Sequence, residues 1–101
     1  MKRRRVVFSA EARADLVALF DFVAETAGEA TASRYLSRVE AFCLGLDLAS
    51  ERGRARDDIR FGLCVVGFER RMSIAFAVRD DVVAILRVFA AGRDWEREFS
   101  P

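Results

Sequence analysis

The residues best suited to contact a target gather toward the end of the sequence. Arg71 opens one apolar run, Arg87 lies inside the next, and Arg93, Asp94 and Trp95 follow it. Guanidinium groups make planar, bidentate contacts to carboxylates, phosphates and aromatic faces. These five residues are therefore the candidate target-binding surface. Arg93 and Asp94 could instead form a local surface pair, and Trp95 could close the core.

Arg87 needs an explanation of its own because it interrupts an apolar run. A buried arginine costs free energy unless it is paired or reaches an edge. The alternative to recognition is an ion pair with a carboxylate of a helix, such as Asp21 or Glu25. The sequence leaves both interpretations open.

The sequence offers little for acid–base catalysis. It contains no histidine, the most usual general base near neutral pH, which excludes Ser-His and Cys-His nucleophile pairs and zinc sites that depend on histidine. The carboxylates Asp57-Asp58 and Asp80-Asp81 each fall in an expected turn and are interpreted as solvated. No glycine spacing matches a phosphate-binding loop. We therefore expect no catalytic residue, no metal and no cofactor, and these absences favour a binding protein over an enzyme.

Length and composition point to one small folded domain over residues 1–101. With 52% apolar residues, the chain is long enough for one core and too short for two. Charges break its apolar runs well short of the roughly 20 residues of a membrane span, and the basic start at Lys2 does not lead into a signal peptide. We expect a cytoplasmic protein without membrane contact. Cys43 and Cys64 match neither a metal site nor a disulfide framework and are interpreted as small buried side chains.

Two helices are expected in the first half of the chain. Ser9 follows a short β-branched segment and is a good N-cap. Apolar residues then recur at helical spacing as far as Gly28. This pattern predicts a first strand followed by a helix over residues 10–27. A second apolar stripe predicts another helix from Glu29 to just before Gly53.

The second half changes to β-branched and aromatic residues after a charged surface connection over residues 54–60. Runs at 63–68, 72–78 and 82–89 are separated by short polar turns, which predicts a three-stranded antiparallel meander. The run at 82–89 is apolar on both faces except for Arg87, as expected of a central strand. The fold class is therefore α+β, with the helical hairpin on one face of the sheet.

Both expected helices carry more apolar surface than one stripe can bury. A helix that is apolar nearly all round is either deep in a large protein or docked on a partner, and this domain has only one sheet to cover it. The alternative is that these side chains tuck under the opposite helix or are singly exposed. The candidate partner surface consists of Val17, Phe22, Ala41, Leu44 and Leu48.

Three stretches, in this order, resemble the ParE and RelE-type toxins of bacterial toxin-antitoxin pairs. Phe8-Ser9 with Ala12, Asp15 and Leu16 resembles their strand-to-helix entry. Residues 71–76, an arginine followed by an alternating apolar run, resemble their third strand. Residues 83–89 with Gly92-Arg93-Asp94 are similar to their closing strand and its terminal Arg-Asp. The resemblance extends from about Val6 to Trp95 and implies a β-α-α-β-β-β fold.

The superfamily has two branches, and the resemblance implies a different activity for each. RelE-type members cut messenger RNA at the ribosome with basic residues and a Tyr or His on the last strand and tail. Here Arg71 and Arg93 match two arginine positions, but Ala90 and Ala91 stand where many relatives carry His, and the sole tyrosine is Tyr35. ParE-type members lack the nuclease groups and are associated with poisoning DNA gyrase.

The ParE branch fits the sequence better. The resemblance then implies a toxin that inhibits DNA gyrase by binding and does not contact DNA except through its antitoxin. It also implies a hetero-oligomer in which a ParD-type antitoxin neutralises the toxin by wrapping its C-terminal segment around it. Such wrapping would account for the surplus apolar helix surface. The alternatives are a ribosome-dependent messenger RNA endonuclease of RelE type and an interaction module without a target.

Overall fold

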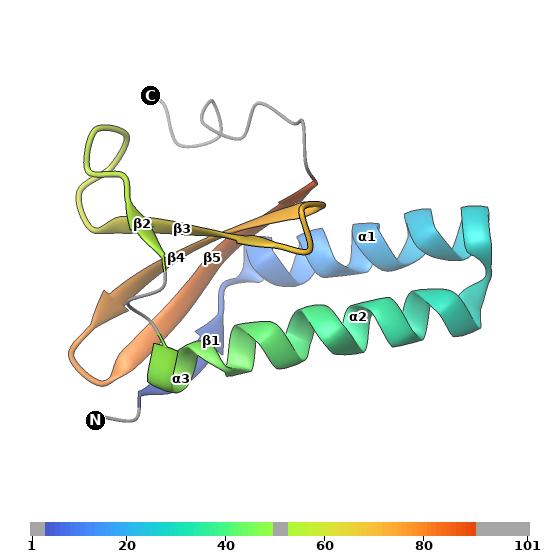
Figure 1. The fold of residues 1–101 in the computed structure, drawn as a ribbon, viewed down its shortest axis with the longest axis horizontal. Coiled ribbons are helices and arrows are strands. Elements are labelled where there is room, and N and C mark those ends of the chain that lie inside the picture. The colour runs from blue at the N-terminus through green and yellow to red at the C-terminus, as the bar shows by residue number, and fades with distance from the viewer. Residues whose placement is uncertain (1–3, 50–52, 91–101) are drawn as a thin grey trace.

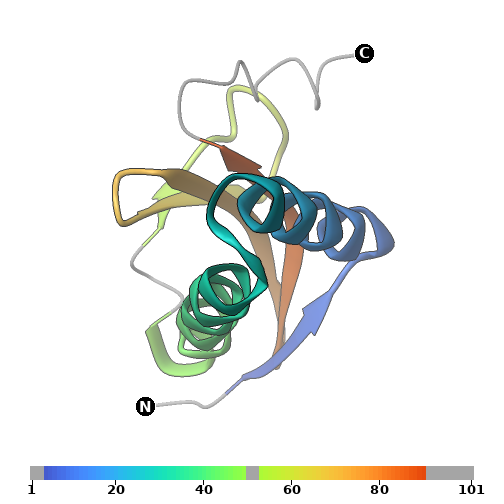
Figure 2. The same ribbon diagram turned by 90° about the vertical axis from the view of Figure 1, so that its right-hand side faces the viewer.

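A computed structural model describes residues 4–49 and 53–90 of the chain, and in it a five-stranded sheet carries a helical hairpin on one face (Figures 1 and 2). The elements in chain order are β1 (Arg5–Phe8), α1 (Ala10–Ala27), α2 (Glu29–Leu44), α3 (Leu46–Ala49), β2 (Arg54–Ala55), β3 (Leu63–Phe68), β4 (Met72–Arg79) and β5 (Val82–Ala90). The strand order is β1-β5-β4-β3-β2, with β1 parallel to β5 and the other pairs antiparallel. The predicted α+β class, the meander and the central position of the last strand are confirmed.

The first helix begins and ends at the predicted residues. The Ser9 hydroxyl caps α1 by accepting a hydrogen bond from the Ala12 amide at 3.0 Å. Gly28, with φ of 93°, ends α1 and leads directly into α2. A residue with a side chain would be strained in this conformation, so the glycine lets the chain reverse within one residue.

The second helix is shorter than predicted, because it ends at Leu44 and a separate turn of helix, α3, follows Gly45. Glycine is a poor helix former, and the break lets Leu46 reach the core, where it is 1% exposed. The surface connection predicted over residues 54–60 also needs correction. Its first two residues form β2, since Arg54 and Ala55 pair in register with Val65 and Cys64.

The core lies between the hairpin and one face of the sheet. Buried side chains from α2 such as Val39 and Cys43 meet Ile74, Phe76 and Ile85 of the central strands. A smaller cluster on the opposite face consists of Leu63, Ala75 and Phe89. Figure 1 shows both long helices continuing past the tips of the strands, so one end of the hairpin overhangs the sheet. Over the described residues, no helix has both the length and the apolar character of a membrane span.

Candidate functional site

Arg87 of the central strand is held by Asp15 of α1. Its Nε and Nη2 atoms donate to the two oxygens of the Asp15 carboxylate at 2.8 and 3.0 Å. The two side chains are only 19% and 13% exposed, and the guanidinium also lies 4.7 Å from the ring centre of Phe89. The alternative interpretation of Arg87, an ion pair with a helix carboxylate, is confirmed, but the suggested partners Asp21 and Glu25 are wrong. The start of α1 packs on β5, whereas those two residues lie further along the helix and are exposed.

An irregularity in β5 brings Arg87 to this position. The β4–β5 register shifts between Ala75 and Phe76, and Leu86 is left without a partner in the ladder. Such bulges turn the following side chain in a new direction. The Ser9 hydroxyl donates to the Leu86 carbonyl at 2.8 Å, and the Val88 amide donates to the Asp15 carboxylate at 2.8 Å. Ser9 and Asp15 therefore complete the hydrogen bonds of β5 beyond the end of β1.

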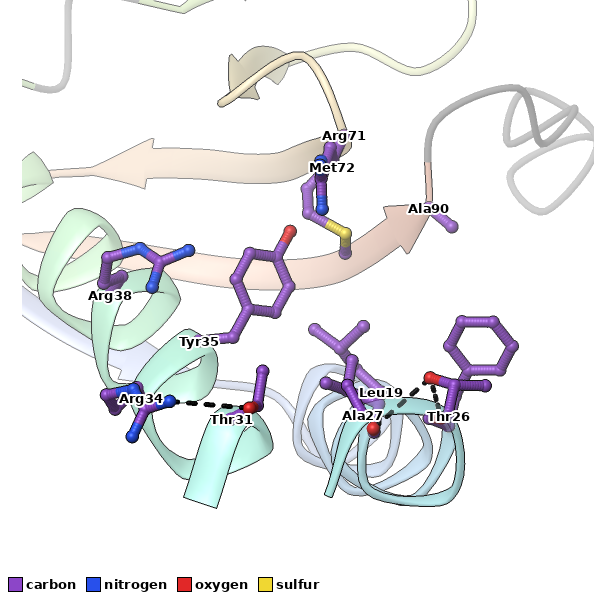
Figure 3. Close-up of a pocket in the computed structure, with 12 residues that line it drawn as sticks. Leu19, Thr26, Ala27, Thr31, Arg34, Tyr35, Arg38, Arg71, Met72 and Ala90 are labelled. Carbon is purple, nitrogen blue, oxygen red and sulfur yellow. Dashed lines mark hydrogen bonds between the residues drawn. The ribbon is translucent and has the colours of Figure 1, made fainter. Parts of the chain in front are cut away.

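A pocket of about 380 Å³ lies where the overhanging end of the hairpin meets the ends of β4 and β5 (Figure 3). One wall is apolar and comes mainly from α1, and the other carries arginines from α2 and from the β3–β4 turn. The lining residues are Leu19, Phe22, Val23, Thr26, Ala27, Thr31, Arg34, Tyr35, Arg38, Arg71, Met72 and Ala90. The pocket thus combines a cationic and an apolar side.

Tyr35 reaches into this pocket from α2 and is 8% exposed. Its ring lies 5.1 Å from the Arg38 guanidinium carbon and 6.5 Å from the centre of the Phe68 ring. Its hydroxyl is buried and has no hydrogen-bond partner among the described residues. Burial raises the pKa of the phenol, and the Glu69 charge adds to this, while Arg71 and Arg38 act in the opposite direction. The hydroxyl is therefore a neutral donor at physiological pH.

The turn between β3 and β4 positions the cationic wall. Glu69 and Arg70 both have positive φ, 51° and 60°, and the Arg71 amide donates to the Phe68 carbonyl at 3.0 Å. Arg38 donates from Nε and Nη2 to the Glu69 carboxylate at 3.0 and 3.2 Å. This hydrogen bonding lowers the pKa of Glu69 and raises that of Arg38. The pair ties the turn to α2.

The structure places the predicted target-binding residues in different surroundings. Arg71 is exposed at the pocket, whereas Arg87 is engaged in the ion pair with Asp15. Arg93, Asp94 and Trp95 lie outside the described residues. The role of all five in target binding stays a prediction.

Four of the five residues of the predicted partner surface are described and exposed. This rules out their burial under the opposite helix and agrees both with a partner surface and with singly exposed side chains. Val17, Phe22 and Leu44 are 63%, 65% and 53% exposed, and Ala41 is exposed as well. The Leu48 side chain lies outside the described part of the structure. Phe22 lines the pocket, whereas Val17 borders a shallow hollow between α1 and α2. Ala41 and Leu44 line neither of these hollows, so the structure does not bring the set together at one place, and its role in partner binding stays a prediction.

Sequence reasoning did not identify Tyr35, Arg34 and Arg38 as site residues. Arg34 and Arg38 are one helical turn apart and flank the only tyrosine of the chain, which is a signal that the sequence contained. Their convergence with Arg71 depends on how the β3–β4 turn meets α2. No local pattern shows that meeting.

The arrangement suits binding better than acid–base chemistry. Burial, with a smaller contribution from Glu40, raises the pKa of the Cys43 thiol to about 12, and burial also raises the pKa of Cys64. Neither thiol can act as a base near neutral pH. Asp57 and Asp58 are exposed turn residues, as predicted. The structure adds that Asp57 accepts a hydrogen bond from the Gly62 amide and Asp58 accepts one from Arg56. Within residues 4–49 and 53–90, no His, Cys, Asp and Glu side chains cluster as a metal site would require.

The fold is that of a small α+β protein in which a helical hairpin covers one face of the sheet. Solved structures with a similar fold include two from toxin-antitoxin systems. A structure of the chromosomal ParDE toxin-antitoxin system from P. aeruginosa is similar, with a TM-score of 0.77 and 22% identity over 88% of this chain and 97% of that chain. The RelBE2 toxin-antitoxin complex from Mycobacterium tuberculosis is also similar, with a TM-score of 0.65 and 23% identity over 87% of this chain and 98% of that chain.

The sequence itself places the chain in a family. The family described as the ParE toxin of the type II toxin-antitoxin system, parDE, matches residues 6–95. The chain therefore belongs to the ParE toxin family, and the expected resemblance from about Val6 to Trp95 is confirmed. A search of curated proteins finds no match.

Proposed function

We propose that this chain is a toxin that inhibits DNA gyrase by binding and is neutralised by a ParD-type antitoxin. The observation that carries the proposal is membership of the ParE family over residues 6–95. That family belongs to type II toxin-antitoxin systems, so a toxin held in check by a protein partner is the general activity. The gyrase target and the class of antitoxin are the specific part of the proposal.

The side chains of the chain support inhibition by binding over cleavage of RNA. Cleavage through the 2′-hydroxyl needs a base for that proton and an acid for the leaving oxygen. The sequence has no histidine, its only tyrosine is 8% exposed with a raised pKa, and both thiols have raised pKa values. A binding mechanism requires none of these groups.

The direct test is gyrase supercoiling of relaxed plasmid in the presence of the purified chain. The expected result is a block of supercoiling that Trp95→Ala weakens and Arg54→Ala, on the exposed strand β2, leaves unchanged. Supercoiling that proceeds unhindered at high toxin excess would contradict the gyrase target.

A ribosome-dependent endonuclease is the second candidate, and the exposed Arg71 beside the pocket favours it. Messenger RNA in a translating extract distinguishes the two. Cleavage that disappears with Arg71→Ala or Arg93→Ala would support the endonuclease, whereas an intact messenger pool beside blocked supercoiling supports the gyrase inhibitor.

The antitoxin part is tested on the exposed apolar residues. Phe22→Asp and Leu44→Asp should each weaken binding of the protein from the neighbouring reading frame and leave the melting temperature within a few degrees of wild type, because both side chains are more than half exposed. Val39→Asp, at a 0% exposed site, should unfold the chain and is the control for loss by misfolding. Growth on induction, with and without the neighbouring protein, reports toxicity and neutralisation together.

A further inference from the structure

We propose that the Tyr35 pocket is a binding site for an acidic peptide segment, which places a carboxylate at Tyr35 and Arg71 and an adjacent large apolar side chain against α1. The proposed function identifies the protein that carries this segment as the antitoxin, and in that one respect the inference rests on the proposed function. The chemistry of the segment follows from the pocket alone.

The first observation is a polar group without a partner. The Tyr35 side chain is only 8% exposed. Its hydroxyl is buried and makes no hydrogen bond to any described residue. Buried tyrosine hydroxyls normally have a hydrogen-bond partner. Figure 3 shows the hydroxyl pointing away from α2 toward Met72 and Arg71. Because the hydroxyl is buried, an oxygen acceptor in this part of the pocket would receive that hydrogen bond once the flexible Met72 side chain beside it turns aside.

The second observation is the charge around this hydroxyl. Arg34, Arg38 and Arg71 all line the pocket. Arg38 is engaged with the Glu69 carboxylate, and Arg34 donates a hydrogen bond to the Thr31 hydroxyl at 3.5 Å. The Arg71 charge helps to lower the pKa of Glu69, but among the described residues the Arg71 side chain forms no ion pair. An anion in the pocket would therefore meet a guanidinium and a phenol donor together, the arrangement that makes short, charge-assisted hydrogen bonds.

The opposite wall requires an apolar group next to that anion. Leu19 and Val23 of α1 line it together with Met72, and Phe22 contributes a ring that is 65% exposed. A free small anion would leave this surface open to water. A peptide with an aspartate or glutamate beside a leucine, phenylalanine or tryptophan would cover both walls, since apolar burial and a charged hydrogen bond are then gained together.

A single-stranded nucleic acid fits the same pocket less well. Proteins that bind it stack bases on open aromatic faces and follow the backbone with a run of cations. The Tyr35 ring is instead contacted by Arg38 and by Phe68. The exposed carboxylates Glu25 and Glu29 adjoin the lining residues in sequence, and the net charge of the chain is only +1. A single carboxylate matches this setting better than a polyanion.

The experiment is selection of random peptides displayed on phage against the purified, full-length chain, followed by affinity measurements on synthetic copies of the enriched peptides. The expected consensus pairs an acidic residue with a large apolar one. Arg71→Ala should lower the affinity about tenfold and Tyr35→Phe about fivefold, as loss of charge-assisted and neutral hydrogen bonds predicts. Arg70→Ala, an exposed neighbour that does not line the pocket, should have no effect.

A second measurement separates binding from folding. Tyr35→Phe keeps the ring and removes only the unpartnered hydroxyl, so its melting temperature should equal or exceed that of wild type while peptide affinity falls. A consensus without acidic residues, equal affinity for wild type and Arg71→Ala, or a single-stranded RNA that displaces the peptides would overturn the proposal. The selection uses the isolated chain without gyrase. Enriched peptides without gyrase inhibition would support the pocket and contradict the gyrase target, whereas gyrase inhibition without enriched peptides would do the opposite.

Discussion

Replacing Asp15 by alanine is the sharpest test of how the helical hairpin is fixed to the sheet. The Asp15 carboxylate accepts three hydrogen bonds, two from the Arg87 guanidinium at 2.8 and 3.0 Å and one from the Val88 amide at 2.8 Å. The substitution leaves a guanidinium that is only 19% exposed without this carboxylate and removes the acceptor of a strand amide. The expected result is a loss of stability.

The expected magnitude follows from burial. Removing one partner of a fully buried ion pair costs about 3–5 kcal/mol, and the partial exposure of this pair places the cost near the lower end, at about 3 kcal/mol. For a domain of this length, that corresponds to a fall in melting temperature of more than ~10 °C. Asp58→Ala is the matched control, because Asp58 pairs with Arg56 at 3.0 Å but is 65% exposed. The control should cost less than about 1 kcal/mol.

The assay is urea unfolding followed by circular dichroism, with Arg87→Met and the double variant completing a double-mutant cycle. The sum of the two single losses should exceed the loss in the double variant, since each single variant leaves one partly buried member of the Asp15–Arg87 pair without the other. If Asp15→Ala and Asp58→Ala prove equally mild, the ion pair does not hold the hairpin and the structural role given to Asp15 is refuted.

Two further predictions concern packing and titration. Gly53→Ala should lower the free energy of unfolding by about 1–3 kcal/mol, because the added Cβ would lie 2.6 Å from the Phe76 ring. Gly67→Ala is the control, since a Cβ there comes no closer than 3.9 Å to its nearest neighbour. Thermal melts compare the two variants, and equal melting temperatures would contradict the packing around Gly53. Burial raises the pKa of the Cys43 thiol from 9.0 to about 12, so the unfolded chain loses this proton first, and stability should fall as pH rises from 9 toward 12 by up to about 1.4 kcal/mol per pH unit. Urea midpoints measured across that range should lose this component of their slope in Cys43→Ala, and an unchanged slope would show that the thiol does not contribute.

Local signals in the sequence were sufficient where an element is specified by its own residues. Ser9 and Gly28 bound α1 because capping and chain reversal depend on single residues. The break at Gly45 was not predicted, since the apolar stripe continues through it and the burial of Leu46, which favours the break, depends on the tertiary fold. The two-residue strand β2 was not predicted either. It exists only through pairing with β3, which no local pattern reveals.

The same distinction explains the site. The apolar surplus on the helices was visible from spacing, and Val17, Phe22 and Leu44 are exposed. The partner of Arg87 was not visible, because it depends on β1 ending at Phe8 so that the start of α1 covers the rest of β5. The pocket was invisible for a similar reason. Tyr35 and Arg71 are far apart in sequence and meet only when the β3–β4 turn docks on α2.

The pocket is lined by residues of two surfaces that were predicted separately. Phe22 belongs to the predicted partner surface and Arg71 to the predicted target surface. A peptide that occupies the pocket would cover Arg71, so neutralisation would act by direct competition if Arg71 also contacts the target. Arg71→Ala should then weaken peptide binding and gyrase inhibition together, whereas Tyr35→Phe, which removes one hydroxyl inside the pocket and leaves Arg71 in place, should weaken peptide binding alone. Full inhibition of supercoiling by Arg71→Ala would show that the target does not depend on Arg71, so that covering this residue cannot account for neutralisation.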